Sequence, residues 1–319
     1  MADHADDDFD GDIFIYRGGR APQHITHARI DKSLDEIENN AFWRCENLVQ
    51  VDTHDGIRRV GKLAFYCCTS LRQINLKSAV EIDQYAFCNC DNLESAEFGV
   101  RLETMGKFAF DRCTSLTHLK LPSIITIGWG AFDSCERLIV FECSERLETI
   151  GKFALNECER LQRIAVPMKR DLFEYDDTWR KYDQFDGCRQ LTTVDIVGGI
   201  HETVASLHME SWRTEMSAEI DRINQVIPNT SAYGKTHVIR RWMNSVIDKM
   251  EHYKAEHYRH MKEGITLLEL ALWKAKLCEK DERKTKKAKI DAESARKERR
   301  ITCGADLVIK NVLPFLQLV

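Results

Sequence analysis

The stretch GKFAFDRCTSL, residues 106–116, recurs along the chain and decides its fold. It holds a glycine, an Ala-Phe step and a cysteine that is followed three residues later by a leucine. Six copies align, and the step between successive cysteines alternates between 23 and 22 in the chain numbering. These cysteines are Cys45, Cys68, Cys90, Cys113, Cys135 and Cys158. Because the same residue types return six times at the same offsets, the segment is an internal repeat.

The full unit reads φxxφGxxAFxxCxxLxxφxφ, where φ is apolar, and a degenerate seventh copy, FDGCRQLTTVDI, occupies residues 185–196. A single unit of this length cannot bury its own apolar side, whereas stacked units bury a continuous core. The LxxφxΦ end alternates with period two, which predicts one short strand per unit and a parallel ladder along the stack. The AFxxCxxL part predicts a helical or irregular corner. We therefore expect an α/β repeat solenoid with short parallel strands on one face, followed by an α-helical C-terminal module.

The repeat resembles IGxxAFxxCxxLxxIxLP, the pattern of the BspA-like leucine-rich repeat family of bacterial, protist and algal proteins. The resemblance covers residues 25–200 closely, and algal or protist members with a C-terminal helical tail resemble the chain most. It implies a right-handed leucine-rich repeat solenoid and a protein-binding role. The family has no shared catalytic residues to carry over.

The chain contains 12 cysteines, a number that also raises the possibility of disulfides or zinc. Zinc sites need paired CxxC ligands, and the chain offers only Cys67-Cys68 and Cys88-x-Cys90 in close spacing. We interpret the repeat cysteines as small apolar side chains that stack in the core. No metal and no cofactor is expected.

Composition and charge indicate a globular protein with 43% hydrophobic and 30% charged residues and a net charge of −5. The acidic start, MADHADDDFDGD, is unlike a secretory signal or a transit peptide, so a reducing compartment is expected, cytoplasmic or also nuclear. The longest apolar run is too short to span a membrane. Three parts are expected: an acidic flexible N-terminus and cap (1–24), the solenoid (25–200, six clear units and one degenerate) and a helical domain (201–319).

In the helical domain, an apolar stripe from Val204 to Ile227 ends at Pro228, and a second stripe runs from Val238 to Met261. These stripes predict two helices of opposite direction, and a third is expected to start near Ile265. The closing stretch GADLVIKNVLPFLQLV, residues 304–319, is expected to fold back as a short helix over a seam. The tryptophans expected to pack between the helices are Trp212, Trp242 and Trp273.

The polar residues of the predicted strands form the first candidate site. Strand alternation turns them outward, where a mixed polar surface suits a protein or peptide partner, although it can also be merely a soluble face. The candidate partner-binding residues are Gln50, Asp52, Gln73, Asn75, Ser95, Glu97, His118, Lys120, Glu142 and Arg163, with Thr193 and Asp195 on the degenerate unit.

The basic segment 274–300 is the second candidate, with 12 Lys or Arg against 6 Asp or Glu. It fits a solvated helix with i,i+4 ion pairs, a nuclear import signal or a nucleic-acid contact, and it holds no aromatic residue on which a base could stack. Its densest part contains Lys284, Lys286, Lys287 and Lys289.

Three further motifs fail on inspection. DDDFDGD begins like a calcium loop but has Arg17 where a bidentate Glu is needed. Lys235-Thr236 ends like a phosphate-binding loop without its first glycine, and predicts a helix start instead. His252, Glu256 and His260 share one helical face and are interpreted as a polar surface stripe rather than a metal site. With no nucleophile beside a base, the favoured function is a non-enzymatic scaffold or adaptor; the alternative is a nucleic-acid-associated or nuclear protein.

Overall fold

The structure is a computed structural model that describes residues 9–174, 183–198 and 210–285. The chain divides into two compact units. The described part of the first unit holds residues 9–174, 183–198 and 210–247, and that of the second holds residues 248–285.

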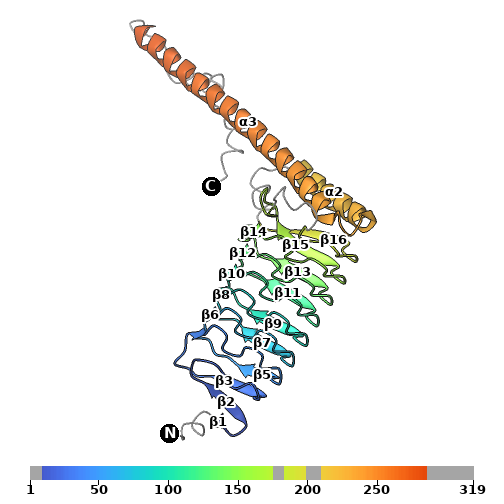
Figure 1. Ribbon diagram of the computed structural model, residues 1–319. Coiled ribbons are helices and arrows are strands. Elements are labelled where there is room, and N and C mark those ends of the chain that lie inside the picture. The colour runs from blue at the N-terminus through green and yellow to red at the C-terminus, as the bar shows by residue number, and fades with distance from the viewer. Residues whose placement is uncertain (1–8, 175–182, 199–209, 286–319) are drawn as a thin grey trace. The chain divides into compact units, whose positions relative to one another are not determined.

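The first strand ladder follows the LxxφxΦ end of the repeat (Figure 1). Its strands are β2 (Ile13–Tyr16), β3 (His27–Ile30), β5 (Gln50–Asp52), β7 (Gln73–Leu76), β9 (Ser95–Phe98), β11 (His118–Leu121), β13 (Val140–Cys143), β15 (Arg163–Pro167) and β16 (Thr193–Val197). Neighbouring strands pair in parallel, within one sheet that ends at β9 and a second that starts at β11. The fold class is confirmed: the chain forms a repeat solenoid followed by helices.

A second ladder was not expected, because we predicted one strand per unit. The last two residues of the φxxφ segment in each unit form a two-residue strand, whose second residue, the second φ, is buried and whose first is more exposed. These strands are β4 (Glu36–Ile37), β6 (Arg59–Val60), β8 (Glu81–Ile82), β10 (Thr104–Met105), β12 (Thr126–Ile127) and β14 (Thr149–Ile150). Two residues are too few to show a period of two, so the sequence pattern could not reveal them.

The AFxxC corner is built from consecutive turns rather than from a helix. Its backbone still pairs from coil to coil: the Phe110 N–H donates to the Ala131 carbonyl at 2.7 Å, and the Arg112 N–H donates to the Asp133 carbonyl at 2.8 Å. Phe108 and Arg112, the residues before the Ala and before the Cys, have φ of 53° and 57°. Each coil is therefore bonded to its neighbours on three sides, which satisfies the buried backbone without helices.

The core is a column of aromatic rings with the cysteines beside it. The rings of Phe42, Phe65, Phe87, Phe110 and Phe132 stack with centroids 4.7 to 5.6 Å apart. All five are fully buried, as are the repeat leucines and the six repeat cysteines. The stacking distance follows from the strand spacing of the ladder, about 4.8 Å.

Part of the N-terminal segment that was expected to be a flexible end and cap, residues 9–16, forms strands at the start of the stack. Strand β2 pairs with β3, and β1 (Phe9–Asp10) folds back antiparallel on β2. Tyr16 is fully buried, and its ring lies 4.9 Å from the ring of Phe42. Without this hairpin the ring of Phe42 and the edge of β3 would be exposed to solvent, so β1 and β2 cap the stack.

The far end of the stack is covered by α2 (Glu210–Val226) and the first turns of α3 (Lys235–Thr285), which a 3-10 turn at Ile227–Asn229 separates. The Asn224 side chain accepts the Val194 N–H at 2.8 Å, so α2 covers the edge of β16. Lys235 is buried, and its ammonium donates to two carbonyls of the last coil, those of Arg189 at 3.2 Å and Leu191 at 2.7 Å. Lys235 is thus a helix start, as predicted, and a polar cap for the solenoid.

The prediction of a third helix near Ile265 is wrong, because α3 continues unbroken through Gly264 to Thr285. A single glycine costs a helix only about 1 kcal/mol, and no proline interrupts the segment. Trp242 is buried, and its indole N–H donates to the Glu219 carbonyl at 3.1 Å, whereas Trp273 is exposed, against the prediction. The side chain of Trp212 and the stretch 304–319 lie outside the described residues. In the part of the chain that the structure describes, no helix is long and apolar enough to cross a membrane.

Candidate functional site

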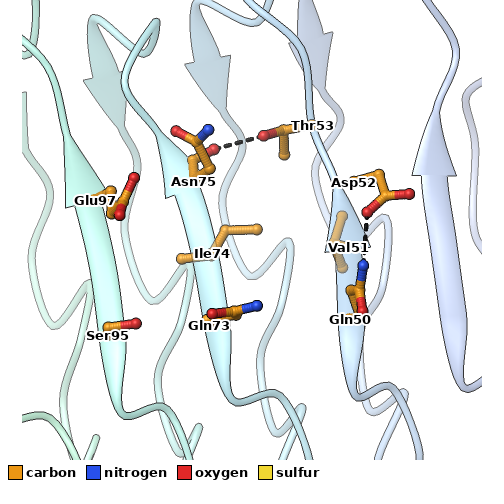
Figure 2. A pocket seen from close by; sticks show the side chains of 9 residues that line it. All are labelled: Gln50, Val51, Asp52, Thr53, Gln73, Ile74, Asn75, Ser95 and Glu97. Carbon is orange, nitrogen blue, oxygen red and sulfur yellow. Dashed lines mark hydrogen bonds between the residues drawn. The ribbon is translucent and has the colours of Figure 1, made fainter.

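A groove of about 420 Å³ runs over the outward side of β5, β7 and β9 (Figure 2). Six of the ten predicted partner-binding residues line it. The lining residues are Gln50, Val51, Asp52, Thr53, Gln73, Ile74, Asn75, Ser95 and Glu97. The structure therefore brings together the predicted residues of three consecutive coils, from strands that are one full repeat apart in sequence.

The groove has this shape because of how its strands pair. Strands β7 and β9 match at four positions, whereas β5 and β7 match at one, Gln50 with Gln73. Beyond that pair the Thr53 hydroxyl donates to the Asn75 carbonyl at 2.6 Å and links the two coils (Figure 2). Val51 and Ile74 point inward and are buried, so the groove has an apolar floor and polar walls.

The two carboxylates of the groove already have cationic neighbours. Asp52 accepts a hydrogen bond from the Gln50 amide at 2.9 Å and lies 3.6 Å from the Arg29 guanidinium. Glu97 lies 2.7 Å from the Lys77 ammonium. Both ion pairs are solvent-exposed, so each stabilises the fold only slightly. Arg29 also lies 3.1 Å from Asp10, so these two cations face three carboxylates and the groove with its ion pairs is slightly negative.

Two groove side chains remain available for a partner. Among the residues that the structure describes, the Gln73 amide and the Ser95 hydroxyl form no hydrogen bond, and both side chains are exposed. Gln73 pairs in register with Gln50 on one side and with Ser95 on the other. The middle of the groove thus offers an amide and a hydroxyl, which can both donate and accept hydrogen bonds.

The other four predicted residues do not line the groove. His118 and Lys120 point outward from β11, beyond the break between the two sheets. Glu142 and Arg163 lie on β13 and β15, where the Arg163 guanidinium contacts the Glu142 and Asp195 carboxylates, each at 2.5 Å. These hydrogen bonds raise the pKa of Arg163 above its ordinary value. The three charges bind one another, so they are less available to a partner than the sequence indicated.

Sequence reasoning missed the residues that set the groove's depth and charge. Thr53 follows the predicted strand and carries no alternation signal, yet it bridges β5 and β7. Arg29, on a neighbouring strand, pairs with Asp52 as well as with Asp10, and Lys77, in a loop, pairs with Glu97. Arg29 could have been found, because it occupies the position equivalent to Asp52 on the preceding strand.

The repeat cysteines are free thiols in the core. The Cys113 thiol donates to the Phe87 carbonyl of the preceding coil at 3.2 Å, and the equivalent bond recurs in the other coils. Burial raises the pKa of Cys113 well above its usual value, so the thiol stays protonated and unreactive. The cysteine is thus a core side chain that also satisfies a carbonyl.

Asp111 is a half-buried carboxylate in the row of residues just before the repeat cysteines. Its Oδ2 accepts a hydrogen bond from the Cys88 thiol at 3.5 Å. Burial, reinforced by the charge of Asp133, raises the pKa of Asp111 from 3.8 to about 6. Asp133 is the equivalent acid one coil further on, and within the described residues no third side chain joins them to form a metal site. The raised pKa of Asp111 therefore makes the fold sensitive to pH without indicating a functional site.

The remaining candidates lie on α3. The His252 ring is 3.9 Å from the Glu256 carboxylate, and the His260 ring is 3.7 Å from Glu263, all at the surface. Within the described ranges, no group of three or more His, Cys, Asp or Glu side chains could hold a metal ion. Of the basic segment, the backbone of Lys284 lies in α3, whereas residues 286–300 lie outside the description, so its role in import or nucleic-acid binding stays a prediction.

Stacked short coils, a parallel ladder at the LxxφxΦ end and inward Leu, Phe and Cys define a repeat protein of the leucine-rich type. The family whose profile matches is described as the BspA type leucine rich repeat region (6 copies), over residues 21–126 and 80–210. The chain belongs to this family, which confirms the resemblance.

Three solved structures are similar to the chain. A leucine rich repeat protein of T. pallidum is 20% identical, with a TM-score of 0.38 over 62% of this chain and 88% of that one. A leucine-rich repeat protein from Bacteroides ovatus is 20% identical, with a TM-score of 0.34 over 54% and 61%. A leucine rich cell surface protein from Faecalibacterium prausnitzii is 18% identical, with a TM-score of 0.26 over 57% and 63%. No curated protein is similar enough to the chain to count as a match.

Proposed function

We propose that this protein is an interaction scaffold or adaptor that binds a protein or peptide partner at the groove over β5, β7 and β9, without catalysis. The observation that carries the proposal is the groove itself, whose Gln73 amide and Ser95 hydroxyl form no hydrogen bond within the described part of the chain. Repeat proteins bind partners over such extended surfaces. Function in a reducing compartment, cytoplasmic or nuclear, is part of the proposal, because the ten cysteines of the described residues are free thiols.

The pattern of side chains favours an extended segment of a partner. One row of the groove holds Gln50, Gln73 and Ser95, at the spacing of neighbouring strands, about 4.8 Å. Amides and hydroxyls at this repeat can bond to the backbone groups of a polar chain that crosses the strands. The slightly negative charge of the groove and its ion pairs disfavours phosphate backbones and suits a neutral polar segment.

The test places a long cation in the groove. Ser95→Arg fills the groove at its β9 wall, and Thr104→Arg introduces the same side chain at an exposed position of the second ladder as the matched control. Wild type and Thr104→Arg are expected to capture the same partners from the source cell. The amount of partner that Ser95→Arg recovers is expected to be lower by about tenfold or more, at unchanged melting temperature. Equal recovery by all three proteins would exclude the groove as the binding surface.

A further inference from the structure

The second unit carries a concentrated apolar surface on α3. Six large apolar side chains lie within thirteen residues of the helix, and 37% to 65% of each is exposed. They are Met261, Ile265, Leu267, Leu270, Leu272 and Trp273. Scattered apolar residues are normal on a surface, but a contiguous group of this size marks a docking site.

The spacing of these residues shows that more than one side of the helix is apolar. Met261, Ile265 and Leu272 follow one stripe with steps of four and seven, whereas Leu267 and Leu270 lie on another. A helix that is apolar over such a wide arc needs a packing partner. Within the described part of the second unit, residues 248–285, α3 is the only helix or strand.

The chain itself supplies an occupant. Its last sixteen residues, GADLVIKNVLPFLQLV at 304–319, include ten apolar residues and only two charged ones, Asp306 and Lys310. Residues 286–303 connect this segment to the end of α3 at Thr285. The helix from Leu267 to Thr285 is about 27 Å long. The connection 286–303 reaches about 60 Å when it is extended, so the segment can return to the apolar surface.

We propose that residues 304–319 dock on the apolar surface of α3 between Met261 and Trp273 of the same chain. A tether of this length holds the segment at a millimolar effective concentration, so docking within the chain outcompetes a second copy at ordinary protein concentrations. The segment and the surface are matched in chemistry, since both are mainly apolar: residues 304–319 hold two charged residues, and residues 261–273 hold three, Lys262, Glu263 and Glu269. The proposal concerns only the second unit and does not depend on the groove.

Hydrogen exchange on the full chain tests the proposal. Val312→Asp with Leu316→Asp replaces two apolar residues of the segment by charged ones, and Asn311→Asp with Gln317→Asp adds the same two charges at polar residues as the control. Exchange of the amides from 258 to 276 is expected to rise about tenfold or more in the first variant and to stay unchanged in the control. Amides of the solenoid serve as an internal reference.

A reciprocal change on the helix completes the test. Leu267→Asp with Leu270→Asp alters exposed positions only, and it is expected to expose residues 304–319 to exchange in the same way. Unchanged exchange in both disrupting variants would overturn the proposal. If the protection of amides 258–276 from exchange grows with protein concentration, and light scattering gives the mass of a dimer, the proposal is overturned in favour of a second copy. Protection that appears only with phosphatidylserine-containing vesicles would assign the surface to a membrane instead.

Discussion

Phe110, within the repeated stretch 106–116, is the residue whose removal should reveal how the solenoid is held together. Its ring is fully buried, with centroids 4.7 Å from Phe87, 5.6 Å from Phe132 and 5.8 Å from Phe98, which it meets edge to face. A buried Phe→Ala change costs about 3–5 kcal/mol, and each ring pair contributes about 0.5–1.5 kcal/mol. With three ring neighbours, Phe110→Ala is expected to cost about 5 kcal/mol.

The matched variant is Phe110→Leu, because the chain itself places Leu155 at the equivalent position of a later coil, where it is also fully buried. Leucine keeps most of the apolar area and loses the ring pairs, so its expected cost is about 2 kcal/mol. Both costs are measured by urea unfolding followed by circular dichroism, with the slope m compared as well, because a repeat stack can unfold in parts. If the two variants cost the same, or if Phe110→Ala costs less than about 1 kcal/mol, the ring column does not stabilise the stack as described.

Three further predictions concern the core and its cap. Cys113→Ala is expected to lower the free energy of unfolding by about 1–2 kcal/mol in urea, because the variant loses a small buried group and the thiol bond to the Phe87 carbonyl. A loss of bound zinc in this variant, measured by native mass spectrometry, would contradict the purely structural role of the cysteine. Lys235→Met removes the ammonium that donates to two carbonyls of the last coil, so it is expected to lower the free energy of unfolding by about 3 kcal/mol. The control Lys254→Met, at an exposed position of α3, should change the free energy of unfolding by less than about 0.5 kcal/mol. Folding raises the pKa of Asp111 from 3.8 to about 6, so the folded state holds this proton more tightly, and the Asp111 contribution to stability should fall as the pH rises through that window. Asp111→Asn should flatten this part of the pH profile in thermal unfolding, and an unaltered profile would show that the carboxyl titrates normally.

The repeat itself could be read from the sequence because its signals are local. The regular return of the cysteine sets the length of the coil, and the period of two after each leucine sets which side chains face out. Gln50, Gln73 and Ser95 point outward for this reason alone. The helix start at Lys235 followed in the same way from a local turn pattern.

Other features depend on residues that are distant in sequence, and only the tertiary structure decided them. The groove lies where β5 and β7 pair at a single position and Thr53 bridges their coils, an arrangement that no local pattern encodes. The Arg163 guanidinium binds both Glu142 and Asp195 because three coils bring these groups within hydrogen-bond distance. The buried ammonium of Lys235 is stable because the last coil offers it two carbonyls. A sequence period predicts which way a side chain points. The charge and depth of the groove and the capping of the last coil depend instead on which residues of other coils and helices lie next to that side chain.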